Sequence, residues 1–248
     1  SLTLTATLSK TASEDVTVTL GTSGAATEGT DYGSLSNITV TAGSLTGTTT
    51  FTPTDDSIYD ATSNETATVS IDSVSGGDAL ENGNQSVTIT ITDNESAPTV
   101  TLSRSAAAID ENSSSTVTIT ATLSNATYQD VTVSIGASGG TEGTDYATIS
   151  DITISAGATT GTATLDPTDD SVYEDDETVT VTIDGVSGGS ASESGSQSVT
   201  ITITENESAP TVTLSVSATS IAENAGTSLT LTATLSGATD ETVTVGID

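Results

Sequence analysis

The sequence predicts an all-β protein built from tandem, immunoglobulin-like, seven-stranded antiparallel β-sandwiches, and three observations support this fold class. Val, Ile or Leu stands at every second position in stretches such as TVTITATLS, with Thr or Ser between them. This period of two is typical of strands with one buried face. Clusters such as SGGSASESG separate the stretches and favour turns. Long segments recur about 112 residues apart, which indicates a repeated domain.

The recurring segments divide the chain into three parts. SAPTVTLS begins at Ser96 and again at Ser208, and residues 1–9 are identical to residues 228–236. We therefore expect a first repeat over residues 1–95 that lacks its first strand, a complete second repeat over 96–207, and the start of a third over 208–248. Either the array continues past the third part, or the strands of that part complete a neighbouring molecule.

The complete repeat contains seven strand-length stretches. Seven short antiparallel strands in about 110 residues fit an immunoglobulin-like sandwich, and a closed barrel fits less well. Helical periodicity of useful length is absent. The predicted strands are residues 99–103, 116–123, 131–135, 149–155, 161–165, 177–183 and 197–204.

Composition excludes several classes of function. The chain has 34 acidic and two basic residues, a net charge of −32, and no Cys, His, Met or Trp. Thiolate or imidazole metal sites, disulfides and histidine-based catalysis are therefore excluded. The charge argues against nucleic-acid binding and against an anionic membrane surface. No apolar run is long enough for a membrane span and no signal peptide marks residue 1, whereas the Thr, Ser, Gly and Asp bias is typical of secreted or cell-surface repeats.

One stretch concentrates negative charge. TDDSVYEDDE, residues 168–177, holds six carboxylates in ten residues. Like charges a few ångströms apart repel by about 1 kcal/mol per pair in water, so the stretch is either a solvated acidic loop or a site for hard cations. Carboxylate and carbonyl oxygens at variable spacing suit Ca²⁺.

The order of the predicted strands brings most acids together. If successive strands run in opposite directions, the loops after the first, third and fifth strands and the end of the seventh share one pole of the sandwich. Of the 17 acids between Ser96 and Ser208, 14 fall there, which favours a cation site over a generally acidic surface. They are Asp110, Glu111, Glu142, Asp145, Asp151, Asp166, Asp169, Asp170, Glu174, Asp175, Asp176, Glu177, Glu205 and Glu207.

Four motifs in order resemble the Calx-beta domain, known from the regulatory region of the sodium–calcium exchanger and from tandem arrays in bacterial surface proteins. They are IDEN at residues 109–112, GTDY at 143–146, DDSVYEDDE at 169–177 and ITITENES at 201–208. The resemblance implies calcium binding. In the second repeat it implies as ligands Glu111, Asp145, Asp169, Asp170, the Val172 carbonyl, Glu174, Glu177, Glu205 and Glu207, with Asn206 where the family often has Asp.

The first repeat departs from this pattern. Its TDDSIYDATSNE has two extra residues and fewer acids, and the counterpart of Glu111 is missing, so we expect fewer or weaker ions there. The residues that the resemblance implies as ligands are Asp31, Asp55, Asp56, the Ile58 carbonyl, Asp60, Glu65, Asp93 and Glu95.

These patterns predict a binding or structural protein and not an enzyme. Paired carboxylates serve glycoside hydrolysis, but five Tyr and one Phe supply few sugar platforms, and no His activates a nucleophile. We predict a calcium-binding repeat region of a long extracellular surface protein, adhesin or filament, stiffened by Ca²⁺ at inter-repeat junctions. The expected partners are calcium ions and neighbouring repeats of the same or identical chains. A calcium-sensing regulatory domain and a ligand-binding adhesive module are the alternatives.

Overall fold

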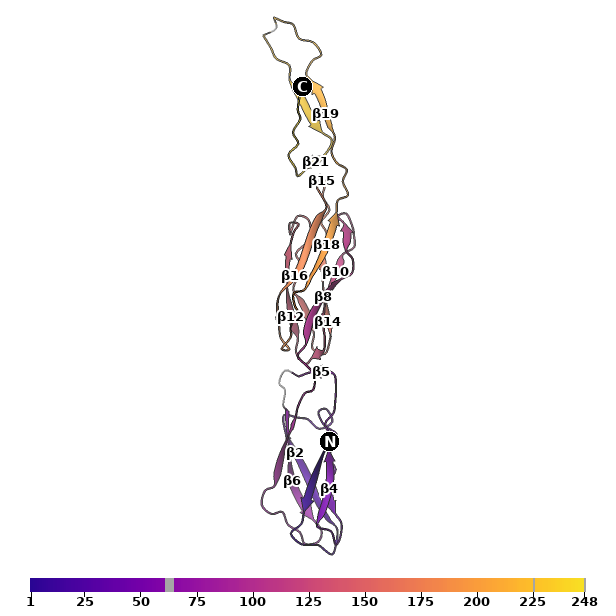
Figure 1. Cartoon of the computed structure of the whole chain (residues 1–248), viewed down its shortest axis with the longest axis vertical. Helices are drawn as coiled ribbons and strands as arrows, with labels where there is room; N and C mark the ends of the chain where they lie inside the picture. The colour runs from indigo at the N-terminus through magenta and orange to yellow at the C-terminus, as the bar shows by residue number, and fades with distance from the viewer. Residues whose placement is uncertain (61–64, 225, 248) are drawn as a thin grey trace. The chain divides into compact units, whose positions relative to one another are not determined.

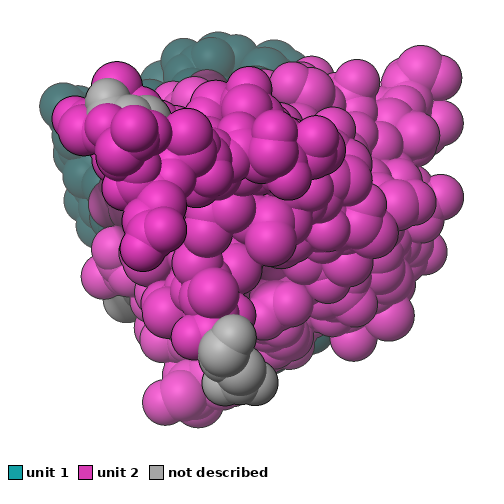
Figure 2. All heavy atoms as spheres, turned by 90° about the horizontal axis from the view of Figure 1, so that it is seen from above, with its two compact units in different colours: residues 1–97, 125–128 teal, residues 98–124, 129–248 magenta. Residues whose placement is uncertain are grey.

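The computed structural model describes residues 1–60, 65–224 and 226–247 (Figure 1). Every regular element in this part of the chain is a strand, and it includes no helix long and apolar enough to cross a membrane. The chain forms two compact units (Figure 2). Unit 1 comprises Ser1–Ala97 and Asn125–Tyr128, and unit 2 comprises Pro98–Ser124 and Gln129–Asp248. We describe each unit by itself.

Unit 2 contains a two-sheet sandwich in which all seven predicted strands are present, so the predicted fold class is confirmed. Two short strands, β9 and β17, extend the sheets through parallel pairing with β18 and β8. One sheet has the order β14 (Thr160–Leu165), β10 (Val117–Leu123), β8 (Thr99–Arg104), β17 (Ser192–Glu193). The other has the order β13 (Ile152–Ile154), β12 (Val131–Ser138), β16 (Glu177–Ser187), β18 (Ser198–Thr204), β9 (Ala108–Asp110).

The alternating sequence explains the core of unit 2. The apolar residues of β10 are buried, and the threonines between them are half-buried on the other face. Ile201 and Ile203 of β18 are buried in the same way, with 0% and 1% exposure. Fully burying one such side chain contributes about 1.5–3 kcal/mol, so the period of two holds the sheets face to face.

The described part of unit 1 has a smaller arrangement of the same kind, without counterparts of β8, β9 and β17. A four-stranded sheet has the order β3 (Ile38–Val40), β2 (Val16–Gly24), β6 (Glu65–Ser75), β7 (Ser86–Ile91). β1 (Leu2–Thr7) pairs with β4 (Thr46–Phe51) to form the second sheet. Tyr32 is buried and stacks on Phe51, with ring centroids 4.6 Å apart.

Each unit also contains a short parallel pair beside its acidic loop. In unit 1, β5 (Ile58–Tyr59) pairs with β11 (Ala126–Thr127). In unit 2, β15 (Val172–Tyr173) pairs with β21 (Ala238–Thr239). By sequence, β11 and β21 belong to the repeat that follows, so each unit includes a segment of the next repeat. The remaining strands, β19 (Val212–Val216) and β20 (Leu231–Leu235), form an antiparallel pair.

The packing of unit 2 predicts a large effect of a single core truncation. Ile201→Ala leaves a cavity at a fully buried position and should lower the free energy of unfolding of unit 2 by about 2–5 kcal/mol, measured by urea denaturation. Thr200→Ala, at the adjacent exposed position, should cost less than about 1 kcal/mol. Equal losses for the two variants would contradict the assignment of faces on β18.

Candidate metal centre

Two strand ends in unit 2 bring three glutamates together. β9 runs parallel to β18, with Asp110 opposite Thr204, and Glu111 N donates to Thr204 O at 3.0 Å. Glu111 and Glu205 therefore follow the ends of neighbouring strands. One carboxylate oxygen from each of Glu111, Glu205 and Glu207 lies within 4.8 Å of the other two.

The acidic loop between β14 and β16 is attached to these glutamates. Asp170 N donates to Glu111 Oε1 at 3.1 Å, and Glu174 N donates to Glu205 Oε2 at 2.5 Å. In the opposite direction, Glu205 N donates to Asp176 Oδ1 at 3.0 Å. The loop is thus fixed by carboxylates and backbone from distant parts of the sequence.

The GTDY segment, residues 143–146, also contacts the acidic loop. Asp145 O accepts a hydrogen bond from Thr168 N at 3.0 Å, and Tyr146 is buried in the core. Burial and, after it, the charge of Asp145 raise the pKa of both Glu174 and Glu177. Hydrogen bonds and electrostatic interactions thus link the residues predicted for the second repeat, with Val172 joined through the N–H that it donates to Asp170. We call this set the acid cluster of unit 2. It comprises Glu111, Asp145, Asp169, Asp170, Val172, Glu174, Glu177, Glu205 and Glu207.

Burial and mutual repulsion perturb the pKa values in this cluster. Burial, followed by the charges of Asp145 and Glu174, raises the pKa of Glu177 to about 7. Burial also raises the pKa of Glu111, which is 7% exposed. Burial alone would raise the pKa of Glu205, but hydrogen bonds from the N–H groups of Glu207 and Glu174 outweigh it and lower the pKa. Four glutamates of the cluster, Glu111, Glu174, Glu177 and Glu207, are therefore less acidic than free carboxyl groups.

One buried oxygen of the cluster has no hydrogen-bond partner among the residues that the structure describes. Glu207 Oε2 is buried and accepts no hydrogen bond, and a buried unsatisfied acceptor costs about 1–3 kcal/mol. It belongs to the same trio as Glu111 and Glu205. Because the trio offers only oxygen donors, the metal that fits it is a hard cation such as Ca²⁺.

Unit 1 gathers its own predicted residues in the same way. Asp60 N donates to Asp93 Oδ2 at 3.0 Å. The hydrogen bond with Asp93 is the main reason that the pKa of Glu95 is raised, and the charge of Asp55 adds a smaller contribution. Burial and then Asp31 raise the pKa of Glu65. The two extra residues of its loop fall within 61–64, outside the described residues. The acid cluster of unit 1 comprises Asp31, Asp55, Asp56, Ile58, Asp60, Glu65, Asp93 and Glu95.

Two residues beside the clusters were not predicted from the sequence. Tyr128 Oη donates to Asp56 Oδ2 at 2.8 Å, and this bond is the main reason that the pKa of Tyr128 is raised to about 12. Asp240 N donates to Tyr173 O at 3.4 Å. Burial is the main reason that the pKa of Glu174 is raised, and the charge of Asp240 adds to it. Both residues directly follow an Ala-Thr pair, β11 or β21, and this recurring dipeptide was the available signal.

One acid assigned to the pole lies elsewhere. Asp151 accepts hydrogen bonds from Ile135 N at 2.9 Å and from Ser134 Oγ at 3.3 Å. These two residues flank the β-bulge of β12. The assignment of Asp151 to the pole was therefore wrong, because its carboxylate binds the backbone and side chain of a bulged strand.

Comparison with known proteins gives two family matches. Residues 2–95 match the Calx-beta domain, and residues 96–208 match the LapA domain. No curated protein matches the chain. Among solved structures, CBD12 from CALX1.2 is similar at 14% identity, covering 82% of this chain and 92% of that one with a TM-score of 0.35.

Two further solved structures are similar at the same level. The calcium binding domain CBD12 of CALX1.1 has 12% identity and a TM-score of 0.35, with coverage of 82% of this chain and 92% of that one. Invasin, a bacterial integrin-binding protein, has 19% identity and a TM-score of 0.36, with coverage of 92% of this chain and 41% of invasin. The family matches therefore divide at the repeat boundary: the first repeat is similar to the Calx-beta domain, and the second to the LapA domain.

Proposed function

We propose that this chain is a calcium-binding structural repeat region of a long extracellular surface protein, adhesin or filament, in which Ca²⁺ at inter-repeat junctions stiffens the array. The observation that carries the proposal is the trio Glu111, Glu205 and Glu207, whose oxygens lie within 4.8 Å of one another. Glu207 Oε2 is buried there without a partner. A cation would satisfy that oxygen.

The donor set favours calcium over other metals. The chain has no Cys or His, so soft or imidazole-preferring metals have no matching ligands. Around the trio, Asp145, Asp170 and Glu174 add oxygens from two other loops. Ca²⁺ takes about six to eight oxygen ligands in a tolerant geometry, whereas Mg²⁺ demands a near-octahedral set. An irregular group of many carboxylates therefore suits Ca²⁺.

The parallel pairs beside the clusters support the stiffening role. In unit 2, β21 of the following repeat pairs with β15 inside the acidic loop, and Asp240 adds negative charge next to Glu174. Bound Ca²⁺ supplies the positive charge that cancels repulsion among these carboxylates. When calcium neutralises the loop, repulsion between carboxylates no longer opposes the pairing of β15 with β21. The short Ser208–Pro210 link also limits the movement of β19 relative to β18.

Calcium should stabilise unit 2 through Glu111. At a free Ca²⁺ concentration of 100 times Kd, each site contributes about 2.7 kcal/mol to folding, which should appear as a higher Tm than in EDTA. Glu111→Gln should weaken calcium binding by about 10–100-fold or more, the range known for less direct changes near a metal. In EDTA the same variant should melt no lower than wild type, because a buried repelling charge is removed.

The matched control for this experiment is Glu193→Gln, a substitution of the same type in β17 outside the acid cluster. It should leave the calcium-dependent rise in Tm unchanged. Parallel scans with Mg²⁺ and with high NaCl measure general charge screening. If calcium raised the Tm no more than these salts do, the calcium-site proposal would be wrong.

The raised pKa of Glu177 predicts a pH-dependent stability of the calcium-free protein. Burial and the charges of Asp145 and Glu174 raise the pKa from 4.5 to about 7, so the folded state binds this proton more tightly than the unfolded state. This stabilisation is complete below the unfolded-state pKa of 4.5 and is lost as the pH rises through the folded-state pKa of about 7. The Tm in EDTA should therefore fall across this window, and saturating calcium should abolish the fall.

Differential scanning calorimetry of wild type and Glu177→Gln across this pH range measures the effect. The variant should show a shallower slope in EDTA, because the titrating carboxyl group is removed. A variant with the full wild-type slope would rule out Glu177 as a source of the pH dependence.

A further inference from the structure

Unit 1 includes four residues of the second repeat, 125–128, which lie beside its acidic loop. Ala126 and Thr127 form β11 and lie opposite Ile58 and Tyr59 of β5. Ala126 is 9% exposed and Thr127 is 1% exposed, so both are as buried as residues of the core. We call residues 125–128 the attached segment of unit 1.

Side chains at both ends of the attached segment hold it by hydrogen bonds. Asn125 Nδ2 donates to Ser96 O at 2.9 Å, and Tyr128 Oη donates to Asp56 Oδ2 at 2.8 Å. The amide and the phenol are neutral donors. The segment is therefore attached to unit 1 without adding negative charge to the acid cluster.

The Tyr128 hydroxyl group completes the hydrogen bonding of Asp56. Asp56 Oδ1 accepts from Ile58 N at 2.7 Å, and Oδ2 accepts from Tyr128. Tyr128 is 51% exposed, so the contact of its hydroxyl group, rather than burial of its ring, fixes the side chain. A hydrogen bond to an ionised acceptor is about twice as strong as one between neutral groups. The partly positive hydrogen of the phenol therefore stabilises the carboxylate in the way that a cation would.

Unit 2 has the same backbone arrangement around its acidic loop. Val172 N donates to Asp170 Oδ1 at 2.6 Å, which matches the bond from Ile58 N to Asp56 in unit 1. β15 and β21 are parallel, as β5 and β11 are, and Val172 lies opposite Ala238. Both acidic loops therefore offer the same backbone site to an Ala-Thr pair.

The side chains that flank the two Ala-Thr pairs differ. Residues 124–128 read SNATY, whereas residues 236–240 read SGATD. Gly237 has no side chain that could replace Asn125, and Asp240 has a carboxylate at the sequence position of Tyr128. The pKa of Glu174 is raised mainly by burial, and the charge of Asp240 adds to it. Asp240 therefore adds to the repulsion that Tyr128 relieves in unit 1.

We propose that the residue at this position, Tyr128 in unit 1 and Asp240 in unit 2, determines whether the Ala-Thr pair stays attached without calcium. Tyr128 holds β11 on the acidic loop through a bond that needs no cation. Asp240 repels the acidic loop of unit 2, and β21 is held firmly only when calcium offsets this charge. The part that concerns Asp240 rests on the proposed function, because calcium is the ion that offsets the charge.

Hydrogen exchange of the whole chain in EDTA, resolved by residue with NMR, tests the role of Tyr128. Tyr128→Phe should speed exchange of the amides in the β5–β11 pair by about 5–10-fold, because the ring remains and its bond to a charged acceptor is lost. Tyr59→Phe is the matched control, since it removes a hydroxyl group from β5 and leaves the bond to Asp56 in place. It should exchange as wild type does.

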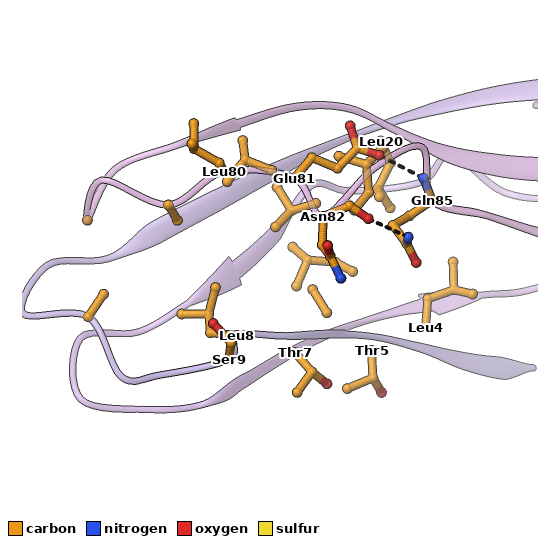
Figure 3. Close-up of a pocket in the computed structure, with 18 of the residues that line it drawn as sticks. Leu4, Thr5, Thr7, Leu8, Ser9, Leu20, Leu80, Glu81, Asn82 and Gln85 are labelled. Carbon is orange, nitrogen blue, oxygen red and sulfur yellow. Dashed lines mark hydrogen bonds between the residues drawn. The ribbon is translucent and has the colours of Figure 1, made fainter.

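A turn in the same unit provides the internal reference. Gln85 N donates to Glu81 Oε1 at 2.8 Å, and Gln85 Nε2 donates to Asn82 O at 2.8 Å (Figure 3). Gln85 precedes β7 (Ser86–Ile91), whereas Asp93 of the acid cluster follows it. Exchange of the Gln85 amide should be the same in wild type and in each variant, which separates local detachment from a general loss of stability.

Tyr128→Asp separates the effect of charge from the loss of the hydroxyl group. It should speed exchange in the β5–β11 pair more than Tyr128→Phe does, because it places a carboxylate beside Asp56. High NaCl should remove most of this additional effect, since salt screens exposed charges. The effect of Tyr128→Phe should persist in the same salt.

The reciprocal change in unit 2 is Asp240→Tyr. In EDTA it should slow exchange in the β15–β21 pair, because a like charge is removed and a donor for Asp170 is gained. Asp240→Phe is its matched control, which loses the charge without gaining the donor and should slow exchange less. In wild type, calcium should slow the same exchange.

Exchange in the β5–β11 pair that Tyr128→Phe leaves unchanged, or that Tyr59→Phe speeds equally, would overturn the proposal. So would an Asp240→Tyr chain that exchanges no more slowly than Asp240→Phe. These comparisons contain no calcium. A wild-type β15–β21 exchange that calcium leaves unchanged would instead contradict the proposed function and not the role of Tyr128.

Discussion

Repulsion among carboxylates at one end of each sandwich determines what the core, the strand ends and the acidic loop must withstand. In unit 2, the β9–β18 pair fixes Glu111 beside Glu205 and Glu207. The backbone of the acidic loop donates hydrogen bonds to two of these groups and so ties a third segment to them. The hydrophobic core must supply the stability that offsets this repulsion. The clusters therefore combine a rigid scaffold with an electrostatic cost that a cation would remove.

The acidic loops also connect each acid cluster to a segment of the repeat that follows. The acidic loop in each unit also forms the two-residue strand that pairs with a segment of the next repeat. The residue after that segment is Tyr128 in one case and Asp240 in the other. Tyr128 donates a hydrogen bond to Asp56, whereas Asp240 adds charge next to Glu174. The two acid clusters therefore meet their neighbouring segments with different chemistry, although the backbone pairing is the same.

The period of two and the turn clusters were sufficient to predict the seven main strands of the second repeat, because burial on one face dominates their sequence. The antiparallel order then predicted that Glu111, Asp145, Asp170 and Glu205 converge. The position of Asp151 was predicted wrongly, because it binds residues at a β-bulge of β12, and the alternating pattern does not reveal a bulge. The roles of Tyr128 and Asp240 were not predicted, because their contacts join segments of different repeats. The periodicity within one repeat carries no information on such pairing.

A crystal structure of the whole chain grown with calcium, with anomalous diffraction data, shows whether an ion occupies the acid cluster. We expect a peak bounded by Glu111, Glu205 and Glu207, with carboxylate oxygens at about 2.3–2.6 Å from it. Glu207 Oε2, which has no hydrogen-bond partner in the structure described here, should be among the ligands. A well-ordered trio without an anomalous peak at saturating calcium would contradict the account.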